Sequence, residues 1–312
     1  MGDVIHGFTV VALIIAAGFS VARTGVLGPH AERVLSALVF NVTTPALIIT
    51  HTATTHPDEL FSPLFAVIVA AEMVMLALVA CSYRLLGRKP WDRAIFSGMS
   101  ASYVNAANLG IPFAVYILSD AHPAVLTIVF QTSLYAPLAL LLVDVYRGAH
   151  SATHATRRPQ EFLTPLKNPI VVSAAIGIFL SVTGITLPSA IFDPLQLLSD
   201  AAVGLALIFF GVSLSSTTFL QKGSVSKREA AGLSVAKSVL HPAVGVGIAT
   251  LMGLEPAGVI AAGLMGALPT AQNVFIYSSR YNTAPHLARD VSVITTFAAL
   301  PVMLVIALVF GG

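Results

Sequence analysis

Apolar residues recur along the chain in runs of about 20, and each run is followed by a short polar break. A helix rises 1.5 Å per residue, so about 20 apolar residues are needed to cross the roughly 30 Å hydrocarbon core of a bilayer. The pattern predicts ten membrane-spanning helices, at residues 4–22, 34–50, 61–86, 94–118, 125–146, 169–187, 195–216, 230–252, 257–278 and 291–310. We therefore expect an all-α integral membrane protein embedded in a lipid bilayer.

The basic residues are unevenly distributed between the predicted loops. Of the 16 Lys and Arg residues, all except Lys237 follow odd-numbered segments, and the loops after even-numbered segments hold none. Lys237 lies inside segment eight. Since Lys and Arg favour cytoplasmic loops, both termini are expected outside a multi-pass protein of the cell (plasma) membrane. The central loop from Arg147 to Lys167 is expected in the cytoplasm.

The two halves of the chain share short motifs at a fixed offset. At an offset of 159 residues, Thr24 coincides with Thr183, Gly25 with Gly184, and Pro29 with Pro188. Five spans is an odd number, so the second copy must be inverted in the membrane relative to the first. We expect two inverted five-helix repeats, residues 1–158 and 159–312. Such repeats are typical of secondary transporters, whose sites lie where broken helices meet near the midplane.

Composition supports a membrane protein and removes several other classes. Hydrophobic residues make up 56% of the 312 residues and charged residues 10%, with a mean hydropathy of +0.87. A soluble domain has about 25% charged residues. The formal charge of +2 gives no basis for a nucleic-acid partner. One cysteine, Cys81, forms neither an internal disulfide nor a thiolate metal cage, and the histidines lack metal-site spacing, so no metal or cofactor is expected.

Motif searches leave transport as the main class of function. The chain has no His-Glu-x-x-His, paired-aspartate or Gly-x-Ser-x-Gly motif, so an enzyme is not expected. It also has no phosphate-binding Gly-x-x-x-x-Gly-Lys-Ser/Thr loop, so transport must be secondary or passive. A passive anion channel is the alternative, but paired broken helices in inverted repeats favour alternating access.

Segments four and nine each carry a predicted interruption in mid-membrane. Pro removes a backbone donor and Gly permits unwinding, so the N-terminus of a half-helix there would attract an anion. The alternative is a simple Pro kink whose Asn side chains are satisfied between packed helices. Candidate substrate-binding residues at the interruptions are Asn105, Asn108, Gly110, Pro112, Thr270, Gln272 and Asn273. On segment five, Gln131 and Tyr135 form a polar face that either lines the cavity or bonds between helices. Tyr103 and Tyr277 are interpreted as packing residues.

Charged and titratable residues inside the predicted spans are candidates for coupling or support. Glu72 lies near the middle of segment three, where an ionised carboxylate is costly unless it is paired or protonated. We interpret it as a coupling or switching residue. The alternatives are a structural pair with a residue such as Gln131 and a buried protonated acid. Lys237 either snorkels to the cytoplasmic end or pairs with a carboxylate, and His241 is interpreted as a polar packing group of helix eight.

Together these residues resemble the auxin efflux carrier family, which includes the plant PIN-type exporters and bacterial permeases assigned to malonate or malate. The resemblance covers nearly the whole chain. The motifs that carry it are Asn41 with Pro45, Asn105 followed by Gly110-Ile111-Pro112, the run from Lys237 to Pro242, and Ala267-Leu268-Pro269 through Tyr281-Asn282. This chain departs from the plant exporters in having Val274 at the crossover of segment nine, where they carry a proline, and in its short central loop.

The resemblance implies that the predicted segments form two domains with different roles. Segments one, two, six and seven would form a scaffold that dimerises, while three to five and eight to ten would form a transport domain that moves as an elevator. It also adds Asn41 to the candidate substrate-binding residues. The resulting expectation is a homodimeric carrier of a small organic anion, either a carboxylate or an auxin-like weak acid, as a uniporter or coupled to protons or sodium.

Overall fold

The computed structural model describes residues 2–54, 62–118, 120–150, 169–216 and 227–310. Every element in these ranges is a helix, and the only β-type pairing in them is an isolated antiparallel bridge between Val104 and Thr270. Five helical stretches are long and apolar enough to span a membrane, at Ala31–Ala53, Pro63–Leu85, Ser189–Ser215, Lys227–Leu251 and Pro285–Val309. Shorter apolar helices cover Thr9–Thr24, Ala106–Leu118, Val171–Thr183 and Pro256–Ala267. The chain is thus a multi-pass membrane protein, and the count of ten spans stays a prediction.

The chain divides into two compact units, each assembled from three separate stretches. Unit 1 comprises Met1–Ser62, Ala106–Thr132 and Phe162–Thr217, and unit 2 comprises Pro63–Asn105, Ser133–Glu161 and Thr218–Gly312. Each unit therefore draws on both halves of the sequence. Most of the predicted cytoplasmic central loop, at residues 151–168, lies outside the described residues.

Unit 1 holds the helices α1 (Gly2–Thr24), α2 (Ala31–Leu38), α3 (Thr44–Ala53), α7 (Ile111–Phe113), α8 (His122–Phe130), α10 (Pro169–Thr183) and α11 (Ser189–Ser216), with the π-helical segments η1 (Val39–Thr43), η2 (Ala106–Gly110) and η3 (Ala114–Leu118). The pair α1 and α11 packs closely because glycines face the neighbouring backbone. A Cβ on Gly18 would meet the backbone of Ile208, and one on Gly211 would meet the carbonyl of Ile15. Gly211 is therefore packed against α1 and is not part of an open face of α11.

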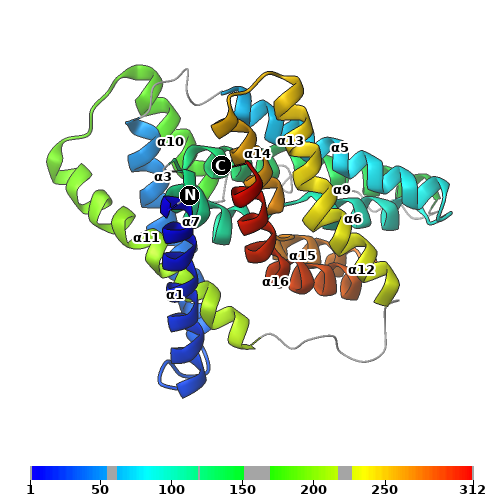
Figure 1. The fold of residues 1–312 in the computed structure, drawn as a ribbon, viewed down its shortest axis with the longest axis horizontal. Helices are drawn as coiled ribbons and strands as arrows, with labels where there is room; N and C mark the ends of the chain where they lie inside the picture. Colours follow the sequence, from blue (N-terminus) through cyan, green and yellow to red (C-terminus); the bar gives the residue numbers. More distant parts are fainter. Residues whose placement is uncertain (1, 55–61, 119, 151–168, 217–226, 311–312) are drawn as a thin grey trace. The chain divides into compact units, whose positions relative to one another are not determined.

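Unit 2 holds α5 (Pro63–Leu85), α6 (Trp91–Ser102), α9 (Ala136–His150), α12 (Lys227–Val235), α13 (His241–Leu251), α14 (Pro256–Ala267), α15 (Gln272–Arg280) and α16 (Pro285–Phe310), with the π-helical segment η7 (Ala236–Leu240). The π-helical segment η4 (Gln131–Tyr135) crosses the boundary between the units. Within unit 2, α5 lies beside α6 and α13, and α16 packs against α12, α14 and α15 (Figure 1). Its core includes Met75, Leu233, Leu287 and Val291.

Four of the π-helical segments share one sequence feature, a proline two residues after their last residue. Pro45 follows η1, Pro112 follows η2, Pro137 follows η4, and Pro242 follows η7. A proline ring clashes with the carbonyl four residues earlier and donates no hydrogen bond to it. That carbonyl lies inside the π-helical segment in each case, where the wider turn relieves the clash. The prolines therefore distort these helices and do not end them.

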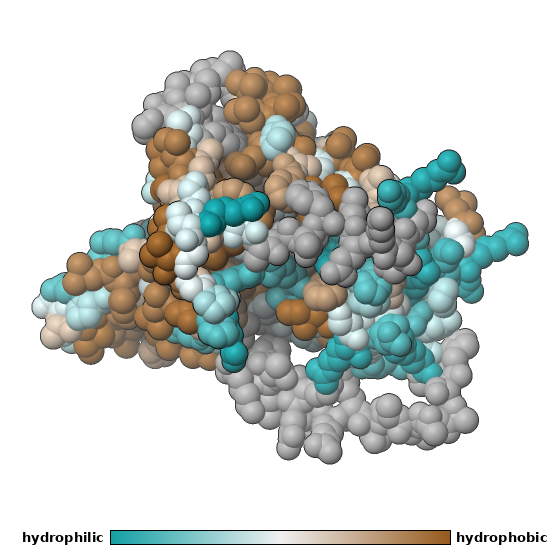
Figure 2. Space-filling view, turned by 90° about the horizontal axis from the view of Figure 1, so that it is seen from below, coloured by the Kyte–Doolittle hydropathy of each residue, from teal (hydrophilic) through white to brown (hydrophobic). Residues whose placement is uncertain are grey.

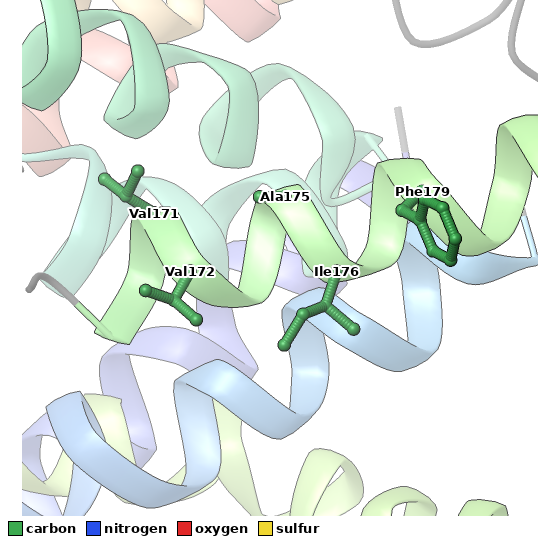
Figure 3. A pocket seen from close by; sticks show the side chains of 5 residues that line it. All are labelled: Val171, Val172, Ala175, Ile176 and Phe179. Atoms are coloured by element: carbon green, nitrogen blue, oxygen red, sulfur yellow. The ribbon is translucent and has the colours of Figure 1, made fainter. Parts of the chain in front are cut away.

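The surface of the described residues is strongly apolar, as a protein in lipid requires. Large hydrophobic side chains such as Leu13, Phe179 and Leu197 are exposed, and Figure 2 shows wide hydrophobic areas with hydrophilic residues gathered in separate places. On α10 an apolar groove of about 330 Å³ is lined by Val171, Val172, Ala175, Ile176 and Phe179 (Figure 3). No side chain in this groove can bind a polar solute, so the candidate site lies elsewhere.

Candidate functional site

Two interrupted helices cross inside unit 2. Helix α6 ends at Ser102 and the chain continues in extended form through Asn105, while α14 ends at Ala267 and α15 begins at Gln272. The two extended stretches pair antiparallel at Val104 and Thr270. The Asn105 amide donates to the Pro269 carbonyl at 2.8 Å, and the Ala271 amide donates to the Tyr103 carbonyl at 3.1 Å. Backbone groups freed by the helix ends are thus satisfied by each other.

Hydrogen bonds to the backbone of α6 and to side chains of α16 fix this crossing. The Thr270 hydroxyl donates to the Ser100 carbonyl at 2.6 Å, and the Thr270 amide donates to the hydroxyl of Thr295 at 3.1 Å. The Ser292 hydroxyl donates to the Thr270 carbonyl at 2.9 Å. Every polar group of Thr270 is therefore engaged in holding the two breaks together.

Two tyrosines flank the extended part of segment four. The rings of Tyr103 and Tyr135 lie with their centroids 5.2 Å apart, and the Tyr135 hydroxyl shares a 2.5 Å hydrogen bond with the hydroxyl of Ser102. The Tyr103 hydroxyl is fully buried beside Asn273 and Tyr277. Within the described residues it makes no hydrogen bond of good geometry. The Tyr103 hydroxyl therefore lies at the crossing together with the side chains of Asn273 and Tyr277.

The helix that leaves the crossing, α15, begins with two exposed polar residues. Gln272 and Asn273 occupy its first turn, and Ala271 before them is extended, with φ −67° and ψ 143°. No side chain caps this end. The first amides of a helix carry partial positive charge and lack intrahelical acceptors. The start of α15 is consequently suited to a carboxylate, with two side-chain amides beside it.

A second polar cluster, buried between α5, η7 and α14, lies behind the crossing. Glu72 and Lys237 are each 0% exposed, so Lys237 does not snorkel to the membrane surface as one reading of the sequence allowed. The Lys237 ammonium donates to the Gly266 carbonyl at 2.7 Å and lies 2.9 Å from Nδ1 of His241. Glu72, His241 and Gly266 line a cavity of about 10 Å³, which holds about one water molecule.

The close approach of α13 and α14 depends on Gly266. A Cβ at this position would lie 2.8 Å from the Cα of Pro242 and 3.2 Å from the carbonyl oxygen of His241. Only glycine at position 266 lets the two helices approach closely enough for its carbonyl to reach Lys237.

Neither Gly266 nor Tyr103 was predicted as a site residue. The signal for each is its position shortly before a predicted interruption: Gly266 directly precedes Ala267, and Tyr103 lies two residues before Asn105.

The remaining predicted residues belong to unit 1. Gly110 and Pro112 lie in continuous helix, in η2 and at the start of α7. The interruption of segment four falls at Tyr103–Asn105, so it meets the predicted stretch Asn105–Pro112 only at Asn105. Asn108 is in η2, and Gln131 is a buried residue at the start of η4. Asn41 lies in η1 and donates to the Ala37 carbonyl at 2.8 Å. The structure brings Asn105, Tyr135, Thr270 and Asn273 together, and it groups Glu72 with Lys237 and His241.

Comparison with known proteins gives matches across almost the entire chain. The family described as "Membrane transport protein" matches residues 3–147 and 156–307. A protein of Rhizobium meliloti (strain 1021) named "Putative malonate transporter" is 25% identical over 275 residues, which cover 85% of this chain and 83% of that protein.

Plant proteins match over a shorter region. The "Auxin efflux carrier component 1" of Arabidopsis thaliana is 25% identical over 150 residues, and the "Probable auxin efflux carrier component 1b" of Oryza sativa subsp. japonica is 26% identical over 156 residues. Each alignment covers 47% of this chain, but only 24% and 27% of the plant proteins. The family match extends over both halves of the sequence and agrees with the apolar helices of the structure. The chain therefore belongs to the auxin efflux carrier family of membrane transport proteins.

Proposed function

We propose that the protein carries a small organic carboxylate across the membrane by an elevator-type alternating-access mechanism. The observation that carries this proposal is the crossing of two interrupted helices inside unit 2, with the start of α15 exposed beside it. Interrupted helices whose N-termini point at a solute are how secondary transporters bind anions in the membrane. The family assignment independently supports transport as the function.

The substrate site that we propose consists of Asn105, Asn273, Gln272, the Tyr103 hydroxyl and the first amides of α15. It offers hydrogen-bond donors and a helix end, and the nearby ammonium of Lys237 is already bound to Gly266. Such a site favours a carboxylate bound through hydrogen bonds over one bound by a direct ion pair. Malonate and auxin, which appear in the names of the relatives, are both carboxylic acids. We assign Thr270 and Tyr135 to positioning the crossing, because their polar atoms are engaged within it.

The division into two units supports movement of the site with unit 2. The crossing, the Tyr103–Tyr135 pair and the Glu72–Lys237 cluster all belong to unit 2, so one body can carry them without breaking their contacts. Unit 1 would then provide the scaffold and, through α11, a homodimer contact around Gly204, where a Cβ would meet nothing within 4 Å. We further propose a plasma-membrane location with both termini outside, on the basis of the distribution of basic residues.

For coupling we propose a proton carried by Glu72 in preference to a sodium ion. The cavity beside Glu72 has room for about one water molecule, and the Lys237 ammonium occupies its Gly266 carbonyl. A sodium ion there would be repelled by the ammonium. A proton on Glu72 needs no ligand shell, and protonation removes the cost of a charge in the membrane.

Counterflow in proteoliposomes tests the transport proposal. Vesicles loaded with unlabelled malonate, indole-3-acetate or another carboxylate are diluted into trace labelled solute, and a carrier accumulates the label transiently above equilibrium. A passive channel dissipates the gradient without overshoot, so equilibration without overshoot for every transported carboxylate would overturn the carrier mechanism. No uptake of any acid in the panel would overturn the substrate class.

A further inference from the structure

A groove on unit 2, distinct from the crossing, runs along the surface between α5 and α12 with η7. Its volume is about 450 Å³. The floor is apolar and includes Leu78, Leu233 and Leu240. From Arg228 at one end to Leu240 at the other is 12 residues, which is about 18 Å of helix at 1.5 Å per residue. One leaflet is half of the roughly 30 Å hydrocarbon core. The groove is therefore about as long as one leaflet is thick.

The polar end of the groove carries one uncompensated positive charge. Its rim includes Ser82, Tyr83, Arg228 and Glu229. The Glu229 carboxylate is neutralised by Arg93, whose Nη2 lies 2.8 and 2.9 Å from the two carboxylate oxygens. Arg228 is exposed and forms no ion pair with any residue in the part of the chain that the structure describes.

Basic residues also surround this end of the groove. Arg84 lies in the last turn of α5, and Lys227 is the first residue of α12, directly before Arg228; both are exposed. Such clusters at the ends of membrane helices attract anionic lipid headgroups. A guanidinium is also the side chain best matched to a phosphate, because its donors bind two oxygens at once.

We propose that this groove binds an anionic phospholipid, with the phosphate at Arg228 and one acyl chain along the apolar floor. A free phosphate would use only the rim and would gain nothing from some 18 Å of apolar groove. A zwitterionic lipid would bring its own cation toward Arg228, Lys227 and Arg84. The charge and the length of the groove therefore both favour an anionic phospholipid.

Two substitutions separate the headgroup contact from the acyl contact. Arg228→Gln removes the charge at the rim. Gly232 lines the groove, and a Cβ built there meets nothing within 4 Å, so Gly232→Leu adds a side chain at the groove. Arg33→Gln is the matched control, because Arg33 is an exposed arginine on α2 of unit 1.

The measurement is binding of phosphatidylglycerol and phosphatidylcholine to the delipidated full-length protein in detergent, by native mass spectrometry. We expect phosphatidylglycerol to bind at least about fivefold more tightly than phosphatidylcholine, and Arg228→Gln to remove that preference. Gly232→Leu should weaken both lipids, and Arg228→Lys should keep most of the preference. Size-exclusion profiles confirm that each variant is folded.

Several results would overturn the proposal. Unchanged phosphatidylglycerol binding in Arg228→Gln would remove the headgroup contact, and unchanged binding in Gly232→Leu would remove the acyl contact. Displacement of phosphatidylglycerol by millimolar inorganic phosphate would identify an ion site. An equal loss in Arg33→Gln would indicate general attraction to a positive surface.

Discussion

The buried polar side chains that hold the crossing differ from the exposed ones at the start of α15, so single substitutions should have separable effects. At the crossing, Thr270 is fixed by three hydrogen bonds, whereas the exposed side chain of Asn273 stands at the start of α15. Behind it, Lys237 is anchored to one carbonyl and one imidazole. Residues that build the crossing and residues that contact a solute can therefore be distinguished by experiment.

Asn273→Ala should weaken substrate binding by about 1 to 3 kcal/mol, because a donor to a shielded solute is lost. The same loss is expected for Asn105→Ala. Ser279→Ala, an exposed change near the other end of α15, should leave affinity unchanged. Equilibrium binding of a transported carboxylate to purified protein measures this effect. Wild-type affinity in the Asn105→Ala, Asn273→Ala double variant would contradict the assignment of the site.

Glu72→Gln should flatten the pH dependence of transport while leaving the fold intact. Glutamine has the shape of the protonated acid but cannot titrate, so a proton carried by Glu72 is no longer released. Initial uptake rates into proteoliposomes at several external pH values, for wild type and variant side by side, give the comparison. If Glu72 is only a packing acid, the variant will keep the wild-type pH profile or lose stability.

At the scale of elements, the contact between α13 and α14 depends on the small size of Gly266. Gly266→Ala places a methyl group 2.8 Å from the Cα of Pro242, so the helices must move apart. We expect a loss of about 1 to 3 kcal/mol in stability, seen as a lower midpoint of thermal unfolding in detergent. Gly247→Ala on α13 is the control: it meets nothing within 4 Å and should be neutral or stabilising. Equal midpoints for the two variants would show that the approach is not tight.

The sequence predicted the interruption of segment nine better than that of segment four. In segment nine, Pro269 lies within the break itself. Proline has no backbone N–H, and no helical hydrogen bond is lost at a position where the helix is already interrupted. In segment four, the predicted stretch Asn105–Pro112 meets the break only at Asn105. Pro112 itself interrupts nothing, because it is the second residue of α7 and η2 before it absorbs the clash. The actual break at Tyr103–Asn105 has no proline. It is stabilised by pairing with a stretch about 165 residues away, which no local pattern records.

The burial of Lys237 also could not be predicted from its position in the sequence. Snorkelling and pairing with a carboxylate were both compatible with its distance from the helix end. The structure instead gives the ammonium the backbone carbonyl of Gly266, a residue 29 positions later that comes within reach only when α13 and α14 touch. The candidate amides Asn105 and Asn273 were predicted, because they sit beside the interruptions. The donor Tyr103 was not, because tyrosines in membrane helices usually serve packing.

At the scale of the whole molecule, the proposed homodimer should form through the open face of α11. In a Cys81→Ser background, Gly204→Cys should form an intermolecular disulfide on mild oxidation, because a side chain at this position meets nothing within 4 Å. Gly211→Cys should form none, since this position packs against α1. Non-reducing electrophoresis measures the cross-linked fraction. A monomeric mass in lipid nanodiscs, together with no cross-link at position 204, would contradict the dimer.

The π-helical segments before Pro45, Pro112, Pro137 and Pro242 also determine where the chain can change length. A π turn holds one residue more than the α turn it replaces. Deleting one residue there replaces the π turn by a regular α turn, so the side chains beyond it keep the faces on which they lie. Deleting a residue from a regular stretch of the same helix would instead rotate every later side chain by about 100°. The π-helical segments are therefore the places in these helices where one residue can be lost while the polar and apolar faces are kept.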